Sequence, residues 1–163
     1  MPEKQTIERA RQAERAGKRP TTQAGEFVRE EIEHVRRGKH GARSTKQAIA
    51  IGLSKARRAG VKLGPPPRSA KAKTRKSAES ALRRAASGGA PSRTRSRAIE
   101  GALRREGRGA ASREALAAQA RQAARRRGAT SRRAAARKAV ETKGPAIRKA
   151  AARKAAETRA AAA

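Results

Sequence analysis

The side chains that could do chemistry in this sequence are mostly cationic. Its 163 residues include 44 Lys and Arg against 13 acidic residues, all of them Glu, which leaves a formal net charge of +31. Such an excess repels itself, and Lys or Arg side chains that bind phosphates release the counterions of a polyanion. The expected partner is therefore nucleic acid, duplex DNA first and RNA second, with an anionic membrane surface as a further alternative.

The other polar residues predict neither catalysis nor a metal site. The two histidines, His34 and His40, are six positions apart and have no Asp or Cys near them. Zinc would need three or four ligands at a suitable spacing. The glutamates of residues 26–33 are interpreted as a solvated helix face that pairs with nearby arginines. We expect no enzymatic activity, no metal and no cofactor, and a chain without Cys has no disulfide framework.

One short segment could hold a single phosphate. Residues 38–45 read GKHGARST and lead into a predicted helix N-terminus. Free backbone N–H groups, the helix dipole, Lys39 and Arg43 could together bind an anion there. An ordinary basic turn between two helices is the alternative. The segment lacks the residue order of a nucleotide-binding GxxxxGK[ST] loop.

The elements that must position these residues fall into two parts, divided at the Gly-Pro-Pro-Pro linker of residues 64–67. Residues 1–63 hold 11 of the 17 apolar side chains larger than Ala and a net charge of +9, so they could form a small helical head. The rest holds six such side chains and a net charge of +22, which is too little to bury a core. We expect an all-α protein in which residues 68–163 are an Ala-, Lys- and Arg-rich tail, helix-prone but largely disordered.

Three helices are predicted in the head, at about residues 2–16, 25–37 and 45–59. Ser44 is a candidate N-cap of the third helix, and Gln47 has the spacing of a capping box. Gly60 ends that helix, with Val61 as the apolar contact of a Schellman motif. The head is thus expected to be a set of short helices joined by glycine-containing turns.

The third helix is predicted to have an apolar inner face and a basic outer face. The inner face should dock on the second helix, with Ile49, Gly52, Leu53, Ala56 and Ala59 against Val28, Ile32 and Val35. Gly52 would let the two helices approach closely. Ile51 falls on the basic side, where it is either exposed or in contact with the first helix or a second subunit.

The tail is punctuated by glycines and contains internal repeats. Glycines separate its basic segments, at Gly88-Gly89, Gly107, Gly109, Gly128 and Gly144-Pro145. Several segments open with N-cap candidates, namely Ser92, Ser112 and Thr130-Ser131. Residues 133–143 match residues 149–159 at eight of eleven positions. These short helix-prone modules lack the apolar stripe that would let them stack on one another.

The residues expected to contact phosphates are Lys and Arg side chains of both parts. In the head they are Arg36, Arg37, Lys39, Arg43, Lys46, Lys55, Arg57 and Arg58. In the tail they are Arg83, Arg84, Arg104, Arg105, Arg125, Arg126, Arg127, Arg132, Arg133, Arg137, Lys138, Lys149, Arg153 and Lys154.

Residues 45–60, TKQAIAIGLSKARRAG, resemble the hallmark helix of a family of small, basic bacterial proteins whose usual form is close to KQAIAIALSEARRAG. Gly52 replaces the usual Ala, and Lys55 replaces the usual Glu. Members of that family are often labelled DNA-binding or plasmid-stabilisation proteins, so the resemblance implies DNA binding. The tail is similar in composition to the tails of linker histones and of bacterial histone-like proteins.

The expected function is that of a nucleoid-associated, histone-like protein of the bacterial cytoplasm, which binds the DNA backbone without strong sequence specificity. A basic RNA- or ribosome-associated protein is one alternative. A membrane-surface or protein-interaction module is another, although the tail lacks the large apolar residues of an interfacial helix. No apolar run is long enough for a membrane span, and the N-terminal residues lack a signal-peptide apolar region.

Overall fold

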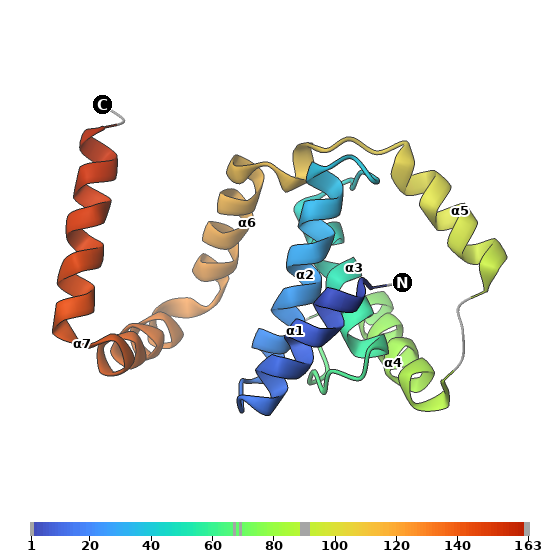
Figure 1. Ribbon diagram of the computed structural model, residues 1–163, viewed down its shortest axis with the longest axis horizontal. Coiled ribbons are helices and arrows are strands. Elements are labelled where there is room, and N and C mark those ends of the chain that lie inside the picture. Colours follow the sequence, from blue (N-terminus) through green and yellow to red (C-terminus); the bar gives the residue numbers. More distant parts are fainter. Residues whose placement is uncertain (1, 67, 69, 89–91, 162–163) are drawn as a thin grey trace. The chain divides into compact units, whose positions relative to one another are not determined.

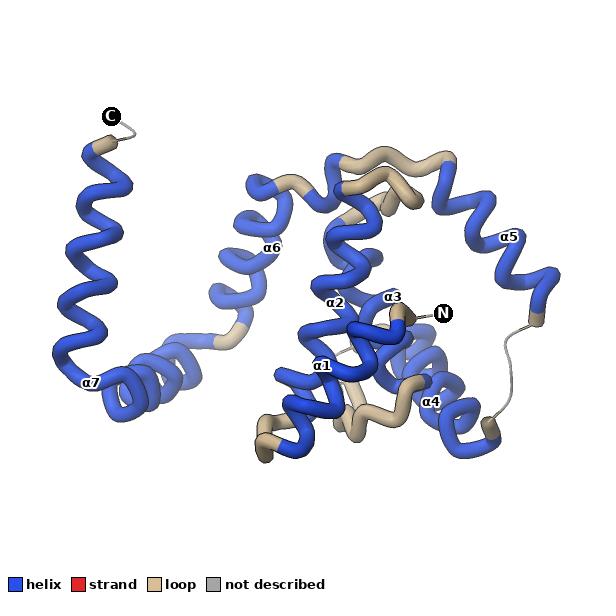
Figure 2. The backbone as a smooth tube through the Cα atoms, in the orientation of Figure 1, coloured by secondary structure: helices blue, strands red, loops and turns tan. Residues whose placement is uncertain are grey.

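The computed structural model describes residues 2–66, 68, 70–88 and 92–161, and these residues form helices joined by loops, with no strand among them (Figures 1 and 2). The helices are α1 (Lys4–Arg15), α2 (Pro20–Arg36), α3 (Thr45–Arg58), α4 (Ala72–Ser87), α5 (Arg93–Arg104), the 3-10 turn η1 (Gly109–Ala111), α6 (Arg113–Arg126) and α7 (Gly128–Ala160). The prediction of an all-α protein is confirmed. Within the described residues, no helix is both apolar enough and long enough to cross a membrane.

The chain divides into two compact units, Met1–Gln119 and Ala120–Ala163. The first unit therefore continues past the predicted linker at residues 64–67, of which Pro67 lies outside the described residues. The prediction of a largely disordered tail is wrong. The described residues after the linker form the helices α4 to α7 and the turn η1, joined by loops. Alanine, Lys and Arg have high helix propensity, and some of these helices also find apolar contacts that composition alone did not reveal.

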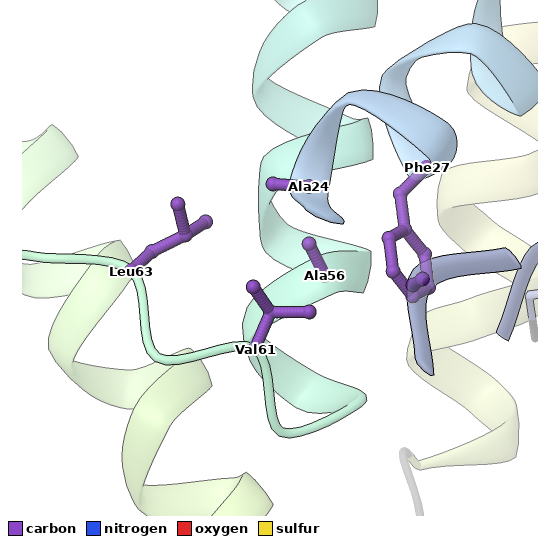
Figure 3. Close-up of a cluster of buried hydrophobic side chains, with 6 residues drawn as sticks. Ala24, Phe27, Ala56, Val61 and Leu63 are labelled. Atoms are coloured by element: carbon purple, nitrogen blue, oxygen red, sulfur yellow. The ribbon is translucent and has the colours of Figure 1, made fainter. Parts of the chain in front are cut away.

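A first apolar cluster joins α1, α2 and the end of α3. Phe27 of α2 is fully buried in this cluster, which also contains small residues and the two apolar side chains that follow α3 (Figure 3). The cluster consists of Ala10, Ala24, Phe27, Ala56, Val61 and Leu63, with Ile7 and Leu53 packed against it. Burying these groups is the main favourable term that holds the three helices together.

A second apolar cluster docks the segment around η1 on α2 and α3. It contains Ile32 and Val35 of α2, Ala42, Ala48 and Ala111, and Leu116 of α6 packs against it. Leu103, at the end of α5, is also buried, with 8% of its surface exposed. A few apolar residues of the supposed tail therefore complete the core of the head, and α4 packs on α3 as well.

The ends of the head helices agree with the prediction, with one exception. α2 begins at Pro20 rather than near Gly25, because proline suits the first turn of a helix. Gly60 has a φ of +91° and ends α3. The Val61 N–H then donates to the Ala56 carbonyl at 3.1 Å, which is the predicted Schellman motif. At the start of α3, the Ser44 side chain accepts from the Gln47 N–H at 3.2 Å, which confirms the predicted N-cap.

The inner face of α3 is made of smaller residues than predicted. Its buried positions are Thr45, Ala48, Gly52 and Ala56, whereas Ile49 and Leu53 are only partly buried and Ala59 is exposed. The predicted close approach at Gly52 is confirmed, since a Cβ there would lie 2.7 Å from the Val28 Cα. Helices that come this close leave room only for small side chains between them, which moves the larger ones to the flanks.

The second compact unit contains the end of α6 and all of α7. Gly144 has non-helical backbone angles, φ 63° and ψ 168°, so α7 consists of two helical arms that meet at Gly144-Pro145. Gly128 also has a positive φ, of 73°, at the start of α7. Predicted breaks at these glycines and at Gly88 are confirmed, while Gly89 lies outside the described residues. The predicted caps Ser92 and Ser112 accept backbone hydrogen bonds, but Thr130-Ser131 lies inside α7 and caps nothing.

Candidate nucleic-acid interface

Lys55 does not lie on a free basic face. Its ammonium is 2.7 Å from Glu31 Oε2 and 3.3 Å from Glu30 Oε1, and only 15% of the Lys55 side chain is exposed. Both glutamates are buried, so the predicted solvated Glu face of α2 is wrong at these two positions. A buried carboxylate needs an opposite charge, and α3 supplies it across the helix interface. Lys55 is therefore a structural partner inside the head, not an open phosphate contact.

Lys39 and Arg37 are exposed but also have acidic partners. The Lys39 ammonium lies 2.8 Å from Glu3 Oε1, and the Arg37 guanidinium lies 3.3 Å from Glu33 Oε2, as the spacing of the latter pair predicts. Hydrogen bonds from Lys39 and His34 lower the pKa of Glu3 to about 2. These pairs leave the surface near the end of α2 closer to neutral than the sequence indicates.

In the segment 38–45, the chain itself occupies two of the backbone donors that were expected to face a phosphate. The Gly41 N–H donates to the Leu103 carbonyl at 2.8 Å, and the Ala42 N–H donates to the Gly107 carbonyl at 3.1 Å. A Cβ on Gly41 would lie 1.8 Å from the Glu106 carbonyl oxygen, so only glycine permits this contact. The alternative interpretation, a turn between two helices, is the correct one, and the turn also receives a distant segment of the chain.

The two arginines near this turn are exposed and tie it to that distant segment. The Arg36 Nε donates to the Ala111 carbonyl at 2.9 Å. The Arg43 Nε lies 3.7 Å from Glu106 Oε1. Lys46 is exposed, and it has no acidic partner among the residues that the structure describes. Of the head cations on this side, Lys46 is the one most available to a phosphate.

A group of cations gathers where α3 and α4 pack. Partial desolvation lowers the pKa of Arg58, and the like charge of Arg84 lowers it further. Burial also lowers the pKa of Arg57. Residues predicted separately for head and tail thus lie close to one another here. Like charges in contact favour an anion between them, which is the behaviour expected of a phosphate site.

α7 carries more Lys and Arg than any other helix that the structure describes, ten of them against two Glu. Its two arms carry the same charge pattern, residues 132–143 and 148–159, with a cation recurring at every equivalent position. The two arms also share a hydrogen bond at equivalent positions. Thr142 Oγ1 donates to the Lys138 carbonyl, and Thr158 Oγ1 donates to the Lys154 carbonyl, both at 2.8 Å. The sequence repeat is therefore a repeat of local structure.

The predicted tail cations are all exposed: Arg83, Arg84, Arg104, Arg105, Arg125, Arg126, Arg127, Arg132, Arg133, Arg137, Lys138, Lys149, Arg153 and Lys154. Among the described side chains of α7, no Lys or Arg forms an ion pair with either of the two glutamates of this helix. Cations spaced four residues apart lie about 6 Å apart along a helix, which destabilises the helix unless anions neutralise them.

One buried group of polar residues is not predicted from the sequence. Glu31, His34 and His40 each place a potential ligand atom within 4.8 Å of the other two. The histidines have no Asp or Cys near them, as the sequence indicates, but a buried Glu supplies a further ligand atom. The spacing of Glu31 and His34, one helical turn, could have suggested that these two meet. No local pattern places His40 beside them.

Residues 11–69 match a family of unknown function, DUF6496. The matched segment contains α2 and α3 with the buried polar group between them, whereas α4 to α7 lie outside it. No curated protein and no solved structure shows significant similarity to the chain.

Proposed function

We propose that this protein binds the phosphate backbone of duplex DNA without strong sequence specificity, as a histone-like protein of the bacterial nucleoid. The proposal rests on one observation above all: α7 presents an exposed row of cations that the described part of the chain does not neutralise. In α1 to α3, by contrast, glutamates neutralise many of the cations.

The geometry of α7 supports contacts to phosphates rather than to bases. Each arm exposes side chains all around its axis, and its apolar residues are nearly all alanines. Nothing in such a helix fixes one face against a groove, as base readout requires. Neutralising phosphates on either side of the helix requires no fixed face, so sequence-independent binding fits this arrangement better.

A membrane surface fits less well than nucleic acid. An interfacial helix buries a face of large apolar residues. In the second compact unit the large apolar residues are Val140 and Ile147, and both are exposed on separate arms of α7. RNA remains the second candidate, because phosphates of either nucleic acid would neutralise the same cations.

The test is a salt titration of duplex DNA binding by the full chain, with structured RNA and anionic vesicles as competitors. If seven or more phosphates are engaged, log K should fall against log salt with a slope of about −6 or steeper. A slope near about −1 would overturn the proposal. Stronger competition by RNA than by unlabelled DNA would assign the binding to RNA, and competition by vesicles alone would assign it to membranes.

A further inference from the structure

The group formed by Glu31, His34 and His40, here called the Glu31 cluster, lies at the C-terminal end of α2. Glu31 and His34 face the same side of α2, and His40 comes from the turn that follows Gly38. Glu31 has no exposed surface, and His34 is only 9% exposed. Three groups with ligand chemistry therefore meet in a mostly dry environment, where electrostatic interactions are strong.

The hydrogen bond of His40 defines which of its nitrogens faces Glu31. Nδ1 lies 3.0 Å from the Gly41 carbonyl oxygen, which can only accept, so Nδ1 carries the hydrogen. When the ring is neutral, it presents the lone pair of Nε2 to Glu31 Oε1, at 3.3 Å. Two acceptors in this position need either a proton or a metal ion between them. A backbone carbonyl bound to the second ring nitrogen is also the usual outer contact of a metal-binding histidine.

The distance between these two atoms suits a zinc ion. Ligands bound at about 2.0 to 2.1 Å in tetrahedral geometry lie about 3.3 Å from each other. The His40 and Glu31 atoms already have this separation, at 3.3 Å. The His34 ligand atom lies within 4.8 Å of both, so a shift of at most about 1.5 Å would complete three ligands, as in open zinc sites with a water in the fourth position.

The local charge also favours a cation. Neither carboxylate oxygen of Glu31 accepts a hydrogen bond of good geometry, although Lys55 approaches Oε2 to 2.7 Å. The same ammonium is shared with Glu30, so one buried positive charge faces two buried negative ones. Lys39, which lies 3.2 Å from His34 Nε2, is half exposed and can move away with its partner Glu3.

We propose that Glu31, His34 and His40 bind one divalent transition-metal ion, with zinc as the best match to a set of two imidazoles and one carboxylate. The ion would link α2 to the turn at residues 38–43. Because Gly41 and Ala42 of this turn carry the hydrogen bonds to residues 103–107, it would also stabilise the docking of that distant segment.

The experiment uses the full chain, freed of metal by a chelator and without nucleic acid, so its outcome is independent of DNA binding. Zn²⁺ alone is titrated against a chromophoric chelator, and Co²⁺ is added separately as a spectroscopic probe. We expect one Zn²⁺ per chain and visible Co²⁺ absorption of four-coordinate type. The net charge of +31 opposes adventitious cation binding and keeps the background low.

The variants H40Q and H34Q should each weaken Zn²⁺ binding more than about 100-fold, since loss of an outer-shell contact alone costs 10- to 100-fold. E33Q is the matched control, because Glu33 lies on the same helix but pairs outward with Arg29 and Arg37. Its Zn²⁺ affinity should stay unchanged, and circular dichroism checks the fold of each variant.

A second readout needs no substitution. The chain has two histidines, so their ring proton signals in an NMR spectrum report on the Glu31 cluster directly. Zn²⁺ should shift both signals at one equivalent per chain. Signals that do not move with Zn²⁺, or an affinity loss in E33Q equal to that in H40Q, would overturn the site.

Discussion

Residues 1–63, which contain α1 to α3, and the helix α7 are both rich in Lys and Arg, but their cations differ in how many have an acidic partner. Residues 1–63 contain seven glutamates, and six of them contact a cation. Two of these six are buried with Lys55. In α7, ten Lys and Arg accompany two Glu, and the described side chains form no ion pair. Six of the 16 Lys and Arg residues of residues 1–63 therefore pair with a glutamate of the same region, whereas none of the described ones of α7 pairs with a glutamate.

The difference shows that an excess of Lys and Arg does not by itself locate a binding surface. It must also be known which of these cations form ion pairs with glutamates. Phe27, Val35 and a few other apolar residues bring α2 against α3, and this packing places Glu30 and Glu31 within reach of Lys55. The large apolar residues of α7 are Val140 and Ile147, and both are exposed. Its cations stay in solvent, where a polyanion can reach them.

The largest expected effect is on DNA binding, when cations of α7 that have no acidic partner are removed. Replacing Arg133, Arg137, Arg153 and Lys154 with Gln should reduce the salt slope of DNA binding by about 3.6 and the affinity at about 0.1 M salt roughly a thousandfold, since each phosphate contact contributes about 0.9 to the slope. The binding is measured by fluorescence anisotropy of labelled duplex DNA.

The matched variant removes four arginines that already have acidic partners. It replaces Arg9, Arg15, Arg29 and Arg37 with Gln, and therefore lowers the net charge by the same amount. Its effect on the slope should be much smaller. Equal losses in the two variants would show that net charge alone matters, and would remove the distinction between the two regions.

The next effect concerns stability. K55M leaves Glu30 and Glu31 buried without their cation, which should cost about 3–5 kcal/mol in the free energy of unfolding. K46M, on the same helix but exposed, should change it by less than about 0.5 kcal/mol. Urea unfolding of the full chain followed by circular dichroism measures both. A K55M variant as stable as K46M would mean that the buried pair is not maintained in solution.

A smaller effect is expected from close helix packing. G52A would place a Cβ 2.7 Å from the Val28 Cα, and forcing α2 and α3 apart should cost about 1–3 kcal/mol despite the better helix propensity of Ala. Gly25 is also inside a helix, but a Cβ there meets nothing within 4 Å. G25A should therefore stabilise the protein by up to about 1 kcal/mol. In thermal unfolding, the midpoint temperature should fall for G52A and rise for G25A.

The smallest effect is the titration of Glu3. Its pKa is lowered to about 2 by Lys39 and His34, so its carboxylate stabilises the fold above the ordinary Glu pKa and loses this contribution as the pH falls through about 2. K39Q should raise the pKa of Glu3 in an NMR titration, whereas K46Q should leave it unchanged. A pKa of Glu3 that K39Q does not change would contradict the contact seen here.

Most of the helical pattern could be predicted because it depends on neighbours in the chain. Ser44 as a cap, Gly60 as a helix end and Gly144-Pro145 as a break all act within a few residues, and all are observed. The predicted start of α2, at about residue 25, is too late, since Pro20 begins this helix. The supposed disorder of the tail came from composition, which does not register that Leu103 and Ala111 are buried.

The sequence by itself determined the all-α fold, the helix boundaries set by caps and glycines, and the excess of positive charge, because each depends on local interactions or on a simple count. Only the tertiary structure decided which cations are neutralised, that residues 103–111 fill the turn expected to hold a phosphate, and that His40 lies beside Glu31. These outcomes depend on contacts between residues far apart in the chain, which the packing of a few apolar side chains selects and no local pattern encodes.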